Sequence, residues 1–477
     1  MEEITRVCGL LGIKTPRVTE SFNTFNNSAK KELPNKFHLS KDSATTSTLP
    51  YQKIFRDSLL VNLIDTALER NLDLKIALQR IEISKAQLLA NKGKLFPYIS
   101  GNASAGVTKF GKYTSDGVGN YDVQYSTNIS KAEIVPQVLP DYFVGLQASW
   151  EVDIWKKLTD AKKSSYYKLL ASQEFKNYSV SSLVAIVADL YFELQALDFE
   201  LEIVKQTVEL QTKQQEIIEL EKQSGRANEL AVQQFEAQAL NFKTIETELK
   251  QRIIIIENTL NTLMVHYDKP VKRTFTKYLD NEIIESQVGI PTDLLQNRPD
   301  IRQAEMNLQA LNFNVNAARK AFYPKLNITG LAGFQTFNFK YLIDPASVTY
   351  NLVGGLVAPL INRSSIKSDF KMAKAMQLEA LYEYQKTILN AYREVNTQIA
   401  ILNNLSTAFE LKQKEVNKLS DAIVTVSELY QRGRATYLEI LYTRKSAFLA
   451  NIELIQIKKK QYEASVLLYK ALGGGWK

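Results

Sequence analysis

The chain has 477 residues, enough for two or three ordinary domains or for one elongated domain. Its single cysteine excludes a disulfide framework, and its two histidines leave too few ligands for a zinc or copper site and disfavour a histidine-activated nucleophile. The net charge of +8 comes from lysines and arginines interspersed with glutamates, which is typical of solvated helices rather than of a nucleic-acid site. We therefore expect no metal, cofactor or nucleic-acid partner, and no nucleophile activated by histidine.

The first predicted element is an extended arm, followed by a helix. Residues 1–56 are polar, rich in Ser, Thr, Asn and Lys, and interrupted by three prolines. A helix is predicted from Asp57 to Leu95, because the residue before Pro97 is disfavoured in helical conformation.

Two longer helices are predicted next, over 162–224 and 229–264, and they complete a first half at 57–264. Apolar residues recur every seven positions along the first of them, which indicates a coiled-coil seam. The two series are Leu183, Leu190, Leu197 and Val204, and Val187, Leu194, Leu201 and Val208.

The same plan repeats in the second half of the chain. A linker at 265–297, expected to be equatorial, leads into a second half at 298–477, with helices predicted at 299–323, 366–431 and 437–472. One heptad position of the middle helix is held by Ile388, Val395, Leu402, Phe409, Val416, Ile423 and Tyr430. The first half carries extra residues that include Thr114–Asp122, predicted as a loop from its glycines and aspartates.

A related short stretch interrupts the helical run of each half, "SGRANEL" at 224–230 and "QRGRATYLE" at 431–439. Gly225 and Gly433 are expected to end one helix in the left-handed conformation. Asn228 and Thr436 are expected to cap the returning helix. Both stretches are therefore predicted to be the tips of helical hairpins.

Between the helices of each half, the apolar period changes from 3.5 to 2. Four strands are predicted, at about 97–110, 143–155, 324–337 and 348–361. In "FVGLQASWEVDIW", for example, Val144, Leu146 and Trp150 alternate with polar residues. Strands of this length, with one apolar and one polar face, are typical of transmembrane barrels.

Four strands cannot close a barrel by themselves, since eight is roughly the minimum. Open strand edges are not tolerated in lipid, so a membrane location requires several copies of the chain. Two copies would give eight strands and three would give twelve. A wide, water-filled lumen favours three.

Several segments resemble the outer-membrane channel subunits of tripartite efflux pumps. They are "IPTDLLQNRPDIRQAEMNLQALNFNVNAARKAFYPKLNITG" (290–330), "ILNAYREVNTQI" (388–399), "YLEILYTRKS" (437–446) and "LYKALGGGW" (468–476), in the family's order. The resemblance is to TolC-like proteins, in the lipoprotein branch often called NodT, and it covers nearly the whole chain. It implies a mainly α subunit that trimerises into a long coiled-coil barrel with a 12-stranded β-barrel in the outer membrane. It also implies a periplasmic adaptor and an inner-membrane RND transporter as partners. The expected function is export of drugs or other small solutes, without any enzymatic activity.

The resemblance places both hairpin tips at the periplasmic end, where the adaptor docks and the tunnel narrows. The docking set is expected to include Gly225, Arg226, Asn228, Glu229, Leu230, Gly433, Arg434, Thr436 and Glu439. The gate is expected at Leu438, Tyr442 and Lys445. The family usually has an acidic residue where this chain has Tyr442, so we expect a gate of leucine and tyrosine with basic surroundings.

Three further expectations concern single residues. Cys8 resembles the lipidated first residue of this branch, although "TRV" precedes it instead of a lipobox, so we expect the true start to lie upstream. In "NRPDI", Pro299 and Asp300 are expected to serve the first turn of a helix. Glu305, Glu394 and Asp189 are expected to be solvated or packing residues.

Two other functions remain open at this point. One is a channel for protein secretion by a type I system, which the arm and "LYKALGGGW" disfavour. The other is a soluble coiled-coil scaffold, which would explain the heptads but neither the alternating strands nor the internal repeat.

Overall fold

The computed structural model describes residues 34, 36–37, 46–274, 278–280, 287–359 and 364–477. These residues form two compact units, each described here by itself. Of the described residues, the first unit holds those in 83–169 and 307–381, and the second holds those in 34–82, 170–306 and 382–477. Cys8 and His38 lie outside the described residues.

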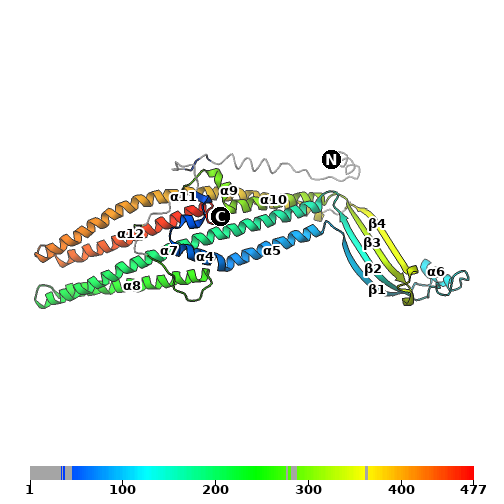
Figure 1. Cartoon of the computed structure of the whole chain (residues 1–477), viewed down its shortest axis with the longest axis horizontal. Helices are drawn as coiled ribbons and strands as arrows, with labels where there is room; N and C mark the ends of the chain where they lie inside the picture. The colour runs from blue at the N-terminus through cyan, green and yellow to red at the C-terminus, as the bar shows by residue number, and fades with distance from the viewer. Residues whose placement is uncertain (1–33, 35, 38–45, 275–277, 281–286, 360–363) are drawn as a thin grey trace. The chain divides into compact units, whose positions relative to one another are not determined.

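The first unit contains an antiparallel sheet of four strands in chain order. They are β1 (Tyr98–Thr108), β2 (Leu139–Val152), β3 (Lys325–Thr336) and β4 (Val348–Val357), which lie side by side in Figure 1. The four predicted strands are therefore confirmed. Strands from both halves of the sequence share the sheet, because β2 of the first half pairs with β3 of the second.

The strand register collects the apolar residues on one face of the sheet. Leu146, Ala332 and Tyr350 form one row across three strands. Tyr350 and Leu352 are 82% and 77% exposed in the single chain. A sheet in a soluble protein buries its apolar face. The exposed apolar face of this sheet is therefore a surface for lipid.

The loop between β1 and β2 contains a short helix, α6 (Ser115–Val123), so the prediction of a loop at Thr114–Asp122 was wrong. The Thr114 side chain accepts a hydrogen bond from the Gly117 amide at 3.1 Å and caps the helix. Asn120 then donates to the Pro136 carbonyl at 3.2 Å. These contacts outweigh the low helix propensity of the two glycines in the segment.

The helix predicted over 57–95 is divided into α4 (Ser58–Arg70) and α5 (Leu72–Gly93). The buried residue Asn71 causes the break. Its side-chain oxygen accepts from the Leu74 amide at 3.1 Å, and its amide donates to the Leu263 carbonyl at 3.1 Å. Asn71 thus ends α4 and caps the start of α5. Its additional hydrogen bond to the distant Leu263 carbonyl stabilises the break.

Four long helices make up most of the rest: α7 (Lys157–Gln223), α8 (Glu229–Leu263), α11 (Ser364–Gln431) and α12 (Tyr437–Ala471). The predicted heptad seam is confirmed, since Leu183, Leu194 and Val204 of α7 are buried in one apolar core with Leu249 of α8. Among the described helices, α7 also contains a stretch long and apolar enough to cross a membrane. However, 67% of that stretch is buried inside the chain, as a coiled-coil seam would be.

The remaining elements are shorter. They are η1 (Thr46–Thr48), α3 (Tyr51–Ile54), η2 (Pro291–Asp293), α9 (Leu294–Asn297), α10 (Pro299–Lys320), η3 (Phe339–Tyr341) and η4 (Pro345–Ser347).

Candidate functional site

The first hairpin tip joins α7 to α8 with the predicted conformations. Gly225 has a φ of +79°, and the Arg226 amide donates back to the Glu221 carbonyl at 2.8 Å. This closes the end of α7 and requires a residue without a Cβ at the left-handed position. The Asn228 side chain accepts from the Ala231 amide at 2.9 Å and caps α8.

The second tip joins α11 to α12 in the same way. Gly433 has a φ of +70°, and the Arg434 amide donates to the Leu429 carbonyl at 2.8 Å. Thr436 and Glu439 form a capping box, in which the Glu439 carboxylate accepts from the Thr436 amide at 2.6 Å. This backbone hydrogen bond lowers the pKa of Glu439. The glycine and cap conformations predicted for both tips are confirmed.

The two tips are linked within the second unit. The Tyr430 hydroxyl on α11 donates to the Glu221 carboxylate on α7 at 2.6 Å. Burial, and then this hydrogen bond, raise the pKa of Tyr430 to about 12, so the hydroxyl stays protonated and able to donate. Next to it, Ile218 and Phe235 of the first hairpin pack against Tyr437 and Leu441 of the second. Neither the hydrogen bond nor this cluster was predicted, because each requires the register of two hairpins 200 residues apart.

The predicted gate residues share one exposed face of α12. Leu438 and Tyr442 are 48% and 75% exposed, and Lys445 is exposed as well. Leu438 and Tyr442 are four residues apart, and Tyr442 and Lys445 are three apart, so the three side chains lie on one side of the helix. Ile440 and Ala447, on the opposite face, are buried.

Some charged side chains of the tips form ion pairs and others do not. Lys222 pairs with Glu229 at 2.6 Å, which lowers the pKa of Glu229 and raises that of Lys222. In the part of the chain that the structure describes, five cations of the tips have no ion pair. They are Arg226, Arg432, Arg434, Arg444 and Lys445.

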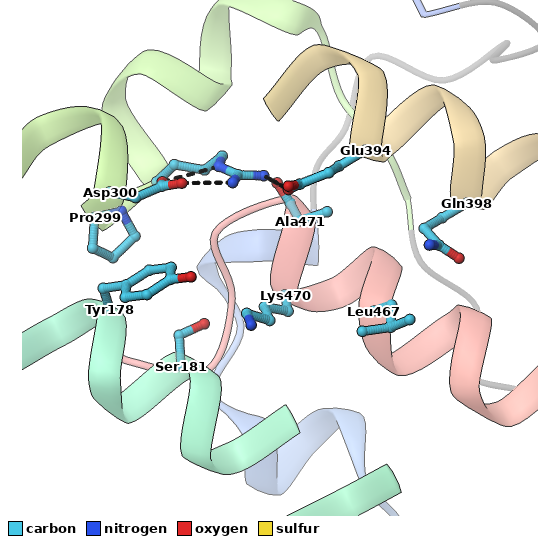
Figure 2. A pocket seen from close by; sticks show the side chains of 10 residues that line it. Tyr178, Ser181, Pro299, Asp300, Glu394, Gln398, Leu467, Lys470 and Ala471 are labelled. Carbon is cyan, nitrogen blue, oxygen red and sulfur yellow. Dashed lines mark hydrogen bonds and ion pairs between the residues drawn. The ribbon is translucent and has the colours of Figure 1, made fainter. Parts of the chain in front are cut away.

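A buried arginine joins three helices in the second unit (Figure 2). Arg298 is 6% exposed and binds Asp300 at 2.6 Å, Glu394 at 2.9 Å and the Ala471 carbonyl at 2.9 Å. Burial opposes its charge, but the hydrogen bonds with Asp300 and Glu394 outweigh this effect and raise the pKa of Arg298. Beside it lies a cavity of about 280 Å³, into which Lys470 points.

The structure adds to the interpretation of three acidic residues. Asp300 does follow Pro299 in the first turn of α10, as predicted, but its carboxylate also neutralises Arg298. Glu394 is solvated as expected, with its side chain 46% exposed, but it also completes the ion-pair network from α11. Asp189 is half-buried, as a packing residue would be, and burial and then Glu463 raise its pKa to about 6.

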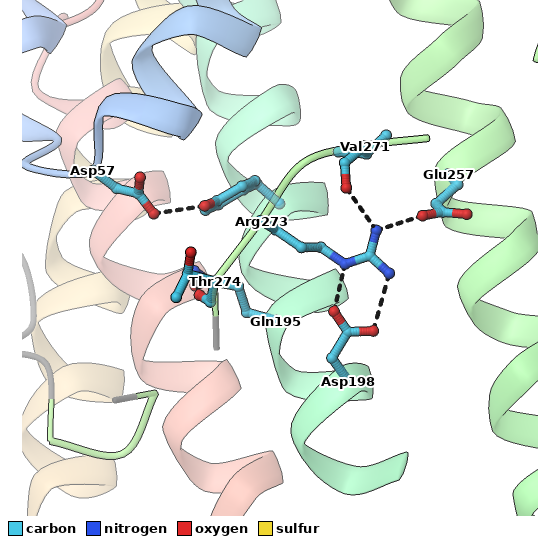
Figure 3. A network of polar contacts seen from close by, with 8 residues as sticks. Asp57, Gln195, Asp198, Glu257, Val271, Arg273 and Thr274 are labelled. Carbon is cyan, nitrogen blue, oxygen red and sulfur yellow. Dashed lines mark hydrogen bonds and ion pairs between the residues drawn. The ribbon is translucent and has the colours of Figure 1, made fainter. Parts of the chain in front are cut away.

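A second network fastens the segment after α8 to the coiled coil (Figure 3). Arg273 binds Asp198 of α7 at 2.5 and 2.9 Å, and also binds Glu257 of α8. Gln195 of α7 donates to the Thr274 carbonyl at 2.7 Å. Burial opposes the charge of Arg273, but its two acidic partners raise its pKa. The segment is thereby held to α7 and α8 by groups that no local pattern in the sequence indicated.

The described residues include no set of metal ligands. Among the described residues, no group of three or more His, Cys, Asp or Glu side chains is arranged to hold a metal ion. The site therefore consists of two linked hairpin tips, an exposed face of α12, and two buried arginine networks.

A sheet with an apolar outer face, together with paired coiled-coil hairpins in the same chain, defines the subunit of an outer-membrane channel of the TolC type. The chain belongs to the outer membrane efflux protein family, whose model matches residues 63–265 and 290–474. It is therefore the outer-membrane component of an efflux system.

Individual relatives are similar over almost their whole length. The chain is 27% identical to the toluene efflux pump outer membrane protein TtgI of Pseudomonas putida over 438 residues, which covers 91% of this chain and 89% of TtgI. It is 25% identical to the probable outer membrane lipoprotein SilC of Salmonella typhimurium over 449 residues, 93% of each. The open-state structure of the MtrE outer membrane channel of Neisseria gonorrhoeae superposes with a TM-score of 0.80 at 22% identity, covering 98% of this chain and 99% of MtrE.

Proposed function

We propose that three copies of this chain close a 12-stranded barrel in the outer membrane and form one continuous exit duct. The observation that carries the proposal is the sheet itself, with an apolar outer face and one unpaired edge on each of β1 and β4. Lipid does not satisfy the backbone groups of such edges, so they must pair with other copies. Pairing of β4 with β1 of the next copy closes the ring.

The duct passes drugs or other small solutes passively from the periplasm to the exterior. Its partners are a periplasmic adaptor and an inner-membrane transporter of the RND type. TtgI, named as part of a toluene efflux pump, supports a small organic cargo, and the branch resemblance supports the RND partner.

The hairpin tips serve as the periplasmic end of the duct. The adaptor docks on the exposed side chains around the two caps, namely Arg226, Glu229, Leu230, Arg434 and Glu439, while the glycines and caps hold the backbone in shape. Leu438, Tyr442 and Lys445 line the gate. Their shared exposed face on α12 supports this role, because the face is not used for packing within the chain.

Cys8 anchors the mature protein through a lipid. The lipoprotein name of SilC supports this assignment, as does the resemblance of the arm that follows Cys8. Mass spectrometry of the outer-membrane protein would refute it by finding Cys8 unmodified.

The test of the duct is the native mass and conductance of the protein, expressed behind a working export signal and extracted in detergent. We expect a complex of three chains of 54.1 kDa each that requires detergent and forms pores in planar bilayers. A protein that stays soluble without detergent and is silent in bilayers would refute the proposal.

Tyr430→Phe is expected to favour the open state of the duct. The substitution removes the hydroxyl that ties the two hairpins through Glu221. A hydrogen bond to a charged group contributes about 1.5–3 kcal/mol, so the ratio of open to closed time should rise by roughly tenfold or more. Single-channel recording measures this ratio. Tyr382→Phe, an exposed tyrosine elsewhere on α11, is the control, and equal gating in both variants would contradict the role of the link.

A further inference from the structure

The exposed face of α12 near the second tip forms one continuous stripe. Leu438, Tyr442, Lys445 and Leu449 are spaced by four, three and four residues, which places them on one side of the helix. Leu449 is 47% exposed, like Leu438. The stripe is therefore apolar and aromatic, with one charged group in the middle.

That charged group is a cation without a counter-ion. Lys445 makes no ion pair within the described chain. The nearest acid in sequence along α12 is Glu439, which lies off the stripe and is held by Thr436 in the capping box. The next acid on the same side of α12 is Glu453, four residues beyond Leu449, and it pairs with Lys412 at 2.6 Å. Lys445 therefore gives the stripe a positive potential.

The surroundings add to this potential. Arg432 and Arg434 at the tip are exposed and unpaired among the described residues, and the adjacent Arg444 is half-buried without an ion pair there. Three acids near the tips are engaged elsewhere: Glu221 by Tyr430, Glu229 by Lys222, and Glu439 by Thr436. These three carboxylates keep their negative charge and still lower the potential from a distance, but none of them lies on the stripe.

We propose that Lys445 makes the periplasmic end of the duct select anions, so that the favoured cargo is an organic anion with an apolar or aromatic body. The inference rests on the proposed function, because it requires three copies with this stripe facing the lumen. Three copies would place a ring of three lysines in the constriction. Rings of Arg or Lys favour anions in pores, as rings of Asp or Glu favour cations. Low-dielectric walls strengthen the field of such a ring.

The chemistry of the stripe also limits the shape of the cargo. The carboxylate, sulfonate or phosphate group of a solute would meet the Lys445 ammonium. Its apolar part would contact Leu449, one turn of helix beyond Lys445, or Leu438, two turns before it, and an aromatic part could stack on Tyr442. Small inorganic anions would use the lysine ring alone.

The test is the reversal potential of the purified trimer in planar bilayers under a KCl gradient at low ionic strength, where surface charges are least screened. We expect chloride to be more permeant than potassium in the unmodified protein. Lys445→Gln should lower the ratio of chloride to potassium permeability by roughly threefold or more, and Lys445→Glu should invert the preference. Lys418→Gln, which removes an exposed lysine of α11 that lies 3.8 Å from Asp421, is the matched control and should change nothing.

Block of the current by an aromatic sulfonate gives a second readout. The block should exceed that by an aromatic ammonium ion of similar size, and should weaken in Lys445→Gln but not in Lys418→Gln. Trimeric pores that prefer potassium, with the same reversal potential in Lys445→Gln, would overturn the inference and leave the duct intact. Absence of pores from the unmodified protein would overturn the proposed function, and the inference with it.

Discussion

Replacing Gly145 by valine is expected to abolish assembly of the channel in the membrane. Gly145 of β2 lies opposite Gly333 of β3, and the two backbones approach too closely for any side chain. A Cβ at Gly145 would lie 2.5 Å from the Ala332 carbonyl oxygen and 2.7 Å from the Gly333 Cα. Both atoms belong to the backbone of the paired strand, so no side chain can move aside, and the strands must separate. Overpacking of this kind costs on the order of 3 kcal/mol or more.

The side chain of Phe143 explains why the site depends on glycine. Phe143 is 7% exposed, whereas every other residue of its strand is half-buried or exposed. A Cβ at Gly145 or at Gly333 would lie 2.8 or 3.1 Å from the end of its ring. The ring therefore covers both glycines, as aromatic residues do where a sheet lacks side chains.

Gly106→Val on β1 is the matched control, because a Cβ there meets nothing within 4 Å. Gly106 lies on the same face of the sheet as Gly145. Ser104, two positions before Gly106 on β1, is the residue that pairs with Phe143. The measurement is the fraction of protein recovered from outer membranes as a trimer. We expect a near-complete loss for Gly145→Val and normal recovery for Gly106→Val. Equal recovery of both variants would show that the close approach of β2 and β3 is not required.

The sequence was most informative where the physical cause is local. The left-handed glycine and the capping residue of each tip require only a few neighbouring residues, and both tips were predicted at the right positions. The strands were predicted from an alternation that each strand carries by itself. The heptads of α7 likewise specify which side of the helix is buried before any partner is known.

The sequence was least informative where two distant segments cooperate. Asn71 breaks a helix because it also reaches the Leu263 carbonyl, nearly 200 residues later. Tyr430 occupies a heptad position, yet its hydroxyl finds Glu221 on another hairpin. The segment around Arg298 was interpreted only through Pro299 and Asp300. The contacts of Arg298 with Glu394 and with the Ala471 carbonyl could not be predicted from the sequence. The single local clue to that network was an acidic residue two positions after an arginine.

Arg298→Met is expected to destabilise the second unit. The substitution leaves the carboxylates of Asp300 and Glu394 without their cation and the Ala471 carbonyl without a donor. The Ala471 carbonyl is left buried without its donor, which costs about 1–3 kcal/mol. The carboxylates of Asp300 and Glu394, 22% and 46% exposed, lose their cation but keep part of their hydration and so add less. Thermal unfolding of the detergent-extracted protein, followed by circular dichroism, measures the loss.

Lys213→Met is the control for this prediction. Lys213 of α7 also forms an ion pair, with Glu209 at 2.6 Å, but both side chains are largely exposed, so its loss should hardly change the stability. The triple variant Arg298→Met, Asp300→Asn, Glu394→Gln should recover part of the stability, since it removes the stranded charges together with the arginine. If the triple variant is as unstable as Arg298→Met alone, the loss comes from packing around the arginine rather than from unpaired charge. That result would restrict the role of the network to filling space between α10, α11 and α12.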